Sequence, residues 1–329
     1  MQNALSKIIS TAGQKAAYDN ACKRILANKS ILAWIMKSCL EEYRDCTVQE
    51  IAEKYIEGKP QISETAVHLD EQVAEEESEP LHYNPMIRGL NTEDASIQEG
   101  TVTYDIRFYA IAPVSGGVIQ LIINVEAQND FYPGYPVVKR NIYYCSRMIS
   151  AQYGTEFVKS HYEKIKKVYS IFICMNPPVY RKNTINCYSM QEKNMIGNVK
   201  EKRENYDLLT AVMICLGNKI DEADTGILRL LEVLLSSERQ AEEKKQILQR
   251  DYGIKMTESL ESEVTEMCDL SKGVEERGIQ KGIQKGIQKG IQRAAQNLMK
   301  NMKLSFSQAM DALGIPEDER EKYRESVKK

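Results

Sequence analysis

The sequence predicts an α/β fold, because segments with the two-residue period of strands alternate with segments of helical periodicity. Apolar and polar residues alternate from 100 to 128 around Ser115-Gly116-Gly117, the pattern of a β-hairpin. A largely apolar strand is expected at 167–175, and helices are expected within 1–57 and over 137–153. We therefore expect a mixed central sheet flanked by helices.

Local signals refine the elements around this hairpin. Ser30 is a candidate cap for a second helix within the first segment, and Thr47-Val48-Gln49-Glu50 fits a capping box that opens another. Residues 185–188 predict a further strand. Helices are expected over 205–218 and 226–250, the latter with a leucine-rich apolar stripe.

The length of 329 residues suits one sizeable domain with appendages, or two small domains. We expect four parts along the chain. They are a domain at 1–220 that holds the hairpin at 99–128, a helical extension at 221–270, a repeat helix at 271–303 and a short helical tail at 304–329.

The repeat helix is marked by the tetrapeptide Gly-Ile-Gln-Lys, which recurs over 278–292. A period of four residues makes the isoleucines wind slowly around a helix, and each helical glycine costs about 0.5–1 kcal/mol relative to alanine. Such a helix needs a partner surface, so we expect docking or a homo-oligomer. In the tail, Phe306 to Tyr323 predicts two short helices separated at Gly314, with Pro316 starting the second.

Composition indicates a soluble globular protein, with 42% hydrophobic and 28% charged residues and a net charge of −3. Any contact with nucleic acid would therefore have to come from local basic patches rather than from the overall charge. The eight cysteines are scattered without zinc-ligand spacing, which favours free thiols, Cys174 among them, and a reducing compartment. The longest apolar run, Ile31 to Met36, is too short to span a bilayer, and the first ten residues lack a signal-peptide pattern. We expect a cytoplasmic protein.

The hairpin register brings two acidic residues together. A turn centred between Ser115 and Gly116 pairs Asp105 with Glu126, and a slip of one residue would mix the apolar and polar faces. Opposed side chains lie about 4.5–5.5 Å apart at Cβ, close enough for two carboxylates to share one cation. Hard cations such as Mg²⁺ or Mn²⁺ prefer oxygen ligands. A solvated polar face that happens to carry two acids is the competing interpretation.

Asp105, followed after about twenty residues by Glu126-Ala127-Gln128 at the end of an apolar strand, resembles the PD-(D/E)xK nuclease superfamily. The chain is more closely similar to Rpn-type recombination-promoting nucleases, also described as PD-(D/E)xK family transposases. Further points of resemblance extend over nearly the whole chain. They are Tyr18-Asp19 with Lys23, Glu99-Gly100, Arg140 and Tyr144, the strand at 167–175 and the glycine-punctuated repeats.

The resemblance implies a restriction-endonuclease-like fold and Mg²⁺- or Mn²⁺-dependent cleavage of DNA, associated with recombination or mobile elements. Asp105, Glu126 and the backbone carbonyl of Ala127 would be the metal ligands. Gln128 would be the third catalytic residue, at the position where many relatives carry lysine. A neutral amide can orient a water molecule but supplies no positive charge to the transition state.

Arg140 and Tyr144 are candidate contacts for DNA phosphate, against the alternatives of a surface salt bridge and packing. Asp19 resembles an acidic residue that supports the metal in the family, although helix capping is the competing role. The last candidate is a basic patch that would follow the DNA phosphates; the alternative is that these residues form only a solvated surface. Its members would be Lys159, Lys164, Lys166, Lys167, Arg181 and Lys182.

Two alternatives to an active nuclease remain open. The first is a catalytically weak or inactive nuclease-like domain that binds DNA without cutting it, favoured by Gln128 and the acidic net charge. The second is an oligomerising scaffold assembled through the C-terminal repeat.

Overall fold

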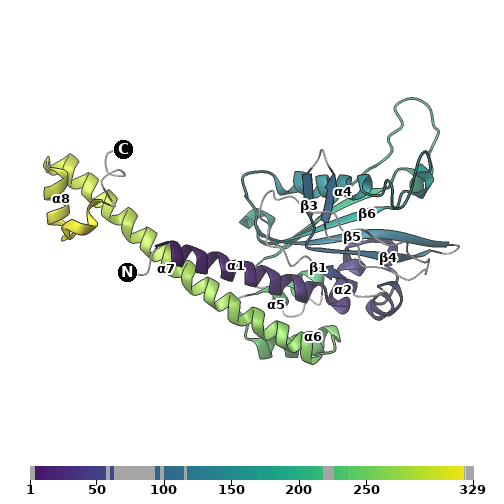
Figure 1. Cartoon of the computed structure of the whole chain (residues 1–329), viewed down its shortest axis with the longest axis horizontal. Helices are drawn as coiled ribbons and strands as arrows, with labels where there is room; N and C mark the ends of the chain where they lie inside the picture. The colour runs from purple at the N-terminus through teal and green to yellow at the C-terminus, as the bar shows by residue number, and fades with distance from the viewer. Residues whose placement is uncertain are drawn as a thin grey trace. The chain divides into compact units, whose positions relative to one another are not determined.

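The computed structural model describes residues 4–56, 60–62, 93–96, 100–114, 117–217, 226–236, 238–321 and 323. Its fold is mixed α/β, with a six-stranded sheet and several helices (Figure 1). The chain divides into two compact units, residues 1–268 and residues 269–329. The predicted α/β class is confirmed at this level.

The sheet of the first unit has the strand order β1-β4-β5-β6-β8-β7. Strands β5, β6 and β8 are parallel to one another, whereas β1, β4 and β7 each run antiparallel to their neighbour. A separate two-stranded sheet pairs β2 (Glu93–Ser96) with β3 (Gly100–Thr103). The bounds in the large sheet are β1 Gln61–Ile62, β4 Ile106–Val114, β5 Gly117–Asp130, β6 Val168–Asn176, β7 Thr184–Ser189 and β8 Leu209–Cys215.

The predicted hairpin register is confirmed along the whole β4–β5 ladder, from Ile106 opposite Val125 to Val114 opposite Gly117. The competing interpretation, a solvated polar face on the hairpin, is wrong. Asn124 and Glu126 lie on that face and are 0% and 3% exposed. The reason is that helices cover both faces of the sheet, so the polar side chains are buried beneath one of them.

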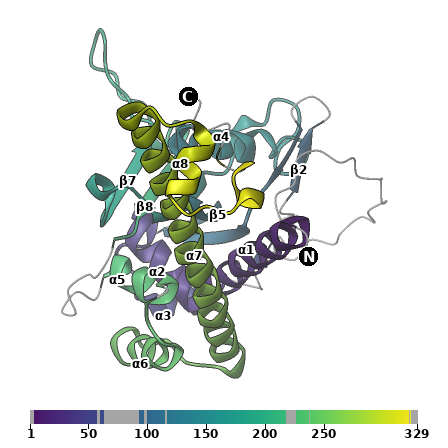
Figure 2. The ribbon, with the colours of Figure 1, turned by 90° about the vertical axis from the view of Figure 1, so that its left-hand side faces the viewer.

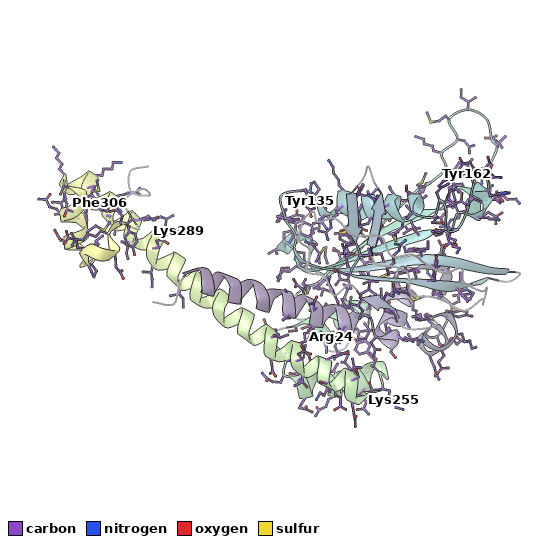
Figure 3. All side chains as sticks on the ribbon, viewed as in Figure 1. Arg24, Tyr135, Tyr162, Lys255, Lys289 and Phe306 are labelled. Carbon is purple, nitrogen blue, oxygen red and sulfur yellow. The ribbon has the colours of Figure 1, made fainter. Side chains whose placement is uncertain are left out.

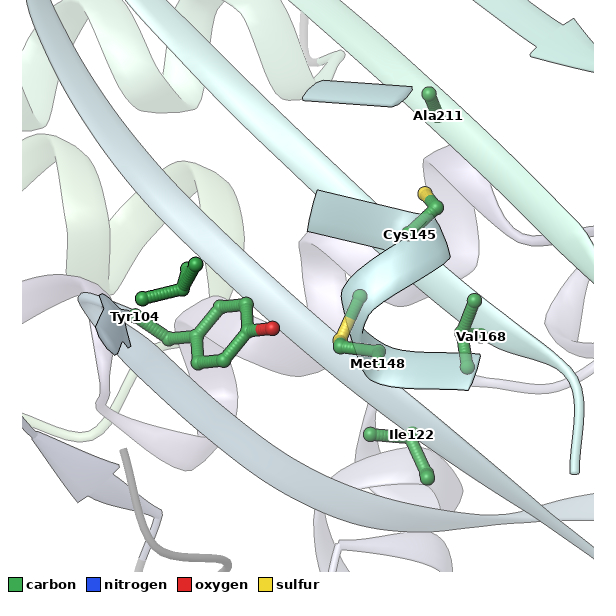
Figure 4. Close-up of a cluster of buried hydrophobic side chains, with 7 residues drawn as sticks. Tyr104, Ile122, Cys145, Met148, Val168 and Ala211 are labelled. Carbon is green, nitrogen blue, oxygen red and sulfur yellow. The ribbon is translucent and has the colours of Figure 1, made fainter. Parts of the chain in front are cut away.

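Helix α4 (Val137–Ser150) covers one face of the sheet, and α1 (Ala4–Leu26), α2 (Lys29–Cys39) and α5 (Ile227–Leu235) lie on the other (Figures 1 and 2). Cys145 and Met148 are one turn apart on α4, and both point into an apolar cluster on the sheet. Figure 4 shows this cluster, which contains Val102, Tyr104, Ile122, Cys145, Met148, Val168 and Ala211. This packing fixes α4 against the strands that carry the candidate site.

The structure confirms the strands expected at 167–175 and 185–188 and the helix expected from residue 137, but it corrects two neighbouring predictions. The helix expected over 205–218 is wrong, because this segment contains β8. A strand buried on both faces has a continuous apolar run that lacks the two-residue period. The segment 226–250 forms two helices, α5 and α6 (Ala241–Tyr252), rather than one.

The helix starts near the N-terminus are set by side-chain caps. Asn28, not Ser30, caps α2, since its side chain accepts a hydrogen bond from the amide of Ser30. The capping box of Thr47 and Glu50 is confirmed at α3 (Val48–Glu50). The shorter helical turns are η1 Glu41–Tyr43, η2 Ile51–Tyr55, η3 Tyr162–Lys164, η4 Val179–Arg181, η5 Arg203–Asn205 and η6 Glu317–Glu319.

The repeat segment is helical, as expected, within α7 (Glu258–Met302). In the second unit α8 (Phe306–Ala312) packs through Ala309 and Met310 on Ala295 of α7. Gly314 has a φ of 68°, and Pro316 precedes η6, so the predicted break between two short helices is confirmed.

The cysteines and the apolar character of the helices bear on two expectations about the whole chain. All eight cysteines lie in the described ranges and are free thiols, and Cys174 is buried in β6 as expected. No helix in the described part of the chain combines the length and the apolar character that crossing a bilayer requires.

Candidate functional site

Asp105 and Glu126 meet as the predicted register requires. The amide of Asp105 donates to Oε1 of Glu126 over 2.9 Å, and the amide of Ala127 donates to Oδ2 of Asp105 over 3.0 Å. Each carboxylate is therefore held by a backbone amide of the segment that carries the other. Asp105 comes directly before β4 and Glu126 lies near the end of β5, so the acid pair sits at one end of the hairpin.

Two cationic side chains from different helices accompany this acid pair. Nζ of Lys23, on α1, lies 2.8 Å from Oδ1 of Asp105, and both side chains are almost fully buried. Nη2 of Arg140, on α4, lies 3.7 Å from Oε2 of Glu126. The pairing of each acid with one cation leaves a buried site without a large net charge.

Burial is the main cause that raises the pKa of Glu126 well above its usual range, and the negative charge of Asp105 raises it further. The hydrogen bond from the amide of Asp105 and the charges of Arg140 and Lys23 act in the opposite direction. Burial and the neighbouring charge therefore favour either a proton on Glu126 or additional positive charge beside it.

Arg140 is not a simple surface ion pair. Nη1 donates to the hydroxyl of Tyr135 over 2.9 Å, and the guanidinium lies 5.0 Å from the ring centroid of Phe172 and 5.4 Å from that of Tyr144. Burial raises the pKa of the Tyr144 hydroxyl, and Glu126 adds to the effect. Tyr144 therefore stays neutral and contributes a packed ring beneath Arg140.

Gln128 follows Glu126 by two residues and so points to the same face of β5. It is 9% exposed and lies opposite Cys174 of β6 in the parallel ladder. Ala127 points to the other face, and its amide is the group that holds Asp105. The structure thus brings Asp105, Glu126, Ala127 and Arg140 together, with Gln128 on the strand beside them.

Two other sequence interpretations are corrected. Asp19 lies well inside α1 and does not cap it, because the helix begins at Ala4, several turns earlier. The six residues proposed as one basic patch do not form one. Lys166 and Lys167 stand at the start of β6, where they pair with Glu156 and with Glu42 and Asp207, whereas Arg181 and Lys182 follow its end. Nine strand residues separate the two groups by roughly 30 Å.

The acid pair offers hard oxygen donors, the carboxylate oxygens of Asp105 and Glu126. In the ranges that the structure describes, no group of three or more His, Cys, Asp or Glu side chains is arranged to hold a metal ion. A two-carboxylate set suits Mg²⁺ or Mn²⁺, because Mg²⁺ commonly binds one or two carboxylates and keeps several water ligands. The buried, mutually repelling acids are the feature that fits such an ion.

The position of Lys23 beside Asp105 is the feature of the candidate site that the sequence does not predict. Cys22, Ile25 and Leu26 around it are fully buried, so Lys23 stands on the apolar side of α1. A lysine on a buried helical face is costly unless it is paired with an acid. A lysine among apolar helical residues is therefore the sequence signal that predicts a buried acidic partner.

Comparison with known proteins adds no relative, since no protein-family model, curated protein or solved structure matches this chain significantly.

Proposed function

We propose that this chain is a metal-dependent endonuclease that hydrolyses DNA phosphodiester bonds, in a restriction-endonuclease-like variant of the mixed sheet. The observation that supports the proposal is the reciprocal hydrogen bonding that holds Asp105 and Glu126 together at the end of the hairpin. The resemblance to recombination-promoting nucleases adds an association with recombination or mobile elements. Free cysteines fit activity in the cytoplasm.

In this proposal the carboxylates of Asp105 and Glu126 and the backbone carbonyl of Ala127 hold Mg²⁺ or Mn²⁺. When bound, the ion neutralises charge on the phosphoryl oxygens and lowers the pKa of a water ligand. The raised pKa of Glu126 supports this role, since bound positive charge would favour its ionised form.

The remaining side chains position the substrate. The Gln128 amide orients a water molecule, while Lys23 supplies from α1 the positive charge that position 128 lacks. The Arg140 guanidinium contacts a DNA phosphate, because its fork of donors suits phosphate geometry. Tyr144 and Phe172 keep that guanidinium in place.

The test is nicking of supercoiled plasmid with Mg²⁺, together with calorimetric titration of Mn²⁺. Asp105→Asn and Glu126→Gln preserve side-chain shape and are expected to abolish both nicking and tight Mn²⁺ binding. Asp207→Asn is the matched control, because Asp207 is another buried acid that lies 2.8 Å from a lysine, Lys167. Nicking by Asp105→Asn at the wild-type rate would refute the proposal.

A second candidate function is DNA binding without cleavage. Both carboxylate oxygens of Asp105 are already engaged, Oδ1 by the ion pair with Lys23 and Oδ2 by the hydrogen bond from the amide of Ala127. Gln128 is also neutral. These two observations support binding without cleavage. An inactive protein would bind DNA equally well with Mg²⁺ and with EDTA and would leave supercoiled plasmid intact in both.

Self-association through the repeat is a separate proposal about assembly. Ile283 and Ile287 stand one turn apart on α7 and are 56% and 57% exposed. Exposed isoleucines in a helix that contains several glycines favour burial against a second copy. Deleting residues 273–296 is expected to convert an oligomer to a monomer in analytical ultracentrifugation.

A further inference from the structure

We infer that three exposed tyrosines, one of them hydrogen-bonded to Arg140 of the candidate site, stack on unpaired bases, so that the chain binds single-stranded DNA in preference to a regular duplex. The tyrosine rim consists of Tyr132, Tyr135 and Tyr180. This inference rests on the proposed function for its substrate class and adds the form of DNA that is bound.

The rim gathers at one edge of the sheet. Strands β5 and β6 are parallel, so the segments that follow Asp130 and Asn176 leave the sheet at the same edge. Tyr132 comes from the first segment and Tyr180 from the second, and their hydroxyl oxygens lie 3.2 Å apart. The two rings are 64% and 73% exposed, which is unusual for large aromatic side chains that stand together.

The rim is connected to the acid pair through one side chain. Tyr135 is 46% exposed and accepts a hydrogen bond from Nη1 of Arg140, while Nη2 of the same guanidinium lies 3.7 Å from Glu126. A strand whose bases stack on the rim would therefore bring its phosphates close to the candidate metal ligands.

The charges around the rim suit a polyanion. Lys139 and Arg140 occupy the first turn of α4, which contains no acidic residue, and Arg181 and Lys182 follow Tyr180. Cations at a helix N-terminus are opposed by the helix dipole, and a bound phosphate would offset that repulsion. Arg181 also lies 5.9 Å from the ring centroid of Tyr180. Aromatic rings interleaved with cations are the arrangement that binds single strands.

Stacking distinguishes the two forms of DNA. In a regular duplex each base is covered above and below by its neighbours, so a tyrosine ring can stack only on a base that is already unstacked. Cations alone would serve duplex binding through phosphates. The exposed rings are the feature that favours single strands.

The chain offers a matched control at a distance from the rim. Tyr162 is 64% exposed, the same value as Tyr132. Figure 3 shows Tyr135 and Tyr162 at opposite ends of the layer formed by α4. Substituting Tyr162 therefore removes an equally exposed ring without touching the rim.

The experiment measures fluorescence anisotropy of the full chain with a short labelled oligonucleotide, single-stranded or annealed to its complement, in EDTA. Tyr132→Ala and Tyr180→Ala are each expected to weaken single-strand binding by roughly 5- to 150-fold. Tyr180→Phe keeps the ring and should bind like the wild type, as should Tyr162→Ala. Duplex affinity should change little in any of these variants.

Equal affinity of the wild type for both forms of DNA would overturn the inference, as would wild-type single-strand binding by both alanine variants. Equal losses in Tyr180→Phe and Tyr180→Ala would assign the effect to the hydroxyl and also overturn it. Failure of this inference is distinguishable from failure of the nuclease proposal. If only this inference failed, nicking would still depend on Asp105. If only the nuclease proposal failed, single-strand binding would still depend on the tyrosines, but no nicking would occur.

Discussion

Replacing Lys23 with methionine tests the charge balance of the candidate site. Methionine has a similar length and a similar helix propensity, so α1 and its packing should persist while the ammonium group is lost. The ion pair with Asp105 has a distance of 2.8 Å, and its side chains are 7% and 11% exposed. The substitution thus leaves a buried carboxylate without its closest cation.

The magnitude follows from this burial. Removing one partner of a buried ion pair costs about 3–5 kcal/mol, because the remaining charge is desolvated and unpaired. At about 2–4 °C per kcal/mol for a domain of this size, we expect Tm to fall by roughly 6–20 °C in EDTA. Mg²⁺ should restore part of the loss, since a ligand at a hundred times its Kd stabilises the native state by about 2.7 kcal/mol.

The assay is thermal unfolding followed by circular dichroism, with and without Mg²⁺. Arg24→Met is the matched control, because the neighbouring Arg24 pairs with Glu266 over 2.7 Å but with side chains that are 37% and 51% exposed. Exposed pairs contribute at most about 1 kcal/mol. If Lys23→Met and Arg24→Met were equally mild, the pair with Asp105 would not be a buried charge pair and the reasoning would be wrong.

Two further predictions concern the strand residues of the site. Glu126→Gln should raise Tm at neutral pH, because the wild-type carboxyl has a raised pKa. The protonated carboxyl of Glu126 contributes stability that is complete below the ordinary glutamate pKa of 4.5. This stability is lost as the pH rises through the folded-state pKa. The Tm difference should therefore vanish below about pH 4.5 in a pH series of melts, and a difference that grew on acidification would contradict this sign. Gln128→Lys places a cation on the face of Glu126 and should raise the rate of plasmid nicking by about tenfold or more; an unchanged rate would mean that charge at this position is not limiting.

The hairpin could be predicted from sequence because its turn and its alternation of apolar and polar residues specify one register. That register was sufficient to place Asp105 opposite Glu126. Strand β8, which pairs with β6 and β7 rather than with the hairpin, could not be predicted as a strand, since a strand covered on both faces has no apolar–polar alternation. Burial of the polar face cannot be predicted locally either, because it depends on α4, which follows β5 in the chain and docks on this face only when the tertiary structure forms.

The positions of the two cations of the site are harder to predict from the sequence than the positions of the acids. Lys23 and Arg140 approach the acids only when α1 and α4 pack on opposite faces of the sheet, and no local pattern encodes either contact. Sequence could mark Lys23 as a charge on a buried helical face. It could not say which acid would compensate that charge.

The two cations differ in how firmly they are held, and this difference bears on the proposed chemistry. Arg140 is fixed by the hydroxyl of Tyr135 and by the rings of Tyr144 and Phe172. Lys23 has a flexible stem, and its ammonium group lies closer to its acid, 2.8 Å against 3.7 Å for Arg140. Arg140 is therefore the cation held at several points, and it links Glu126 with the tyrosine rim, whereas Lys23 supplies its charge through a single close pair with Asp105.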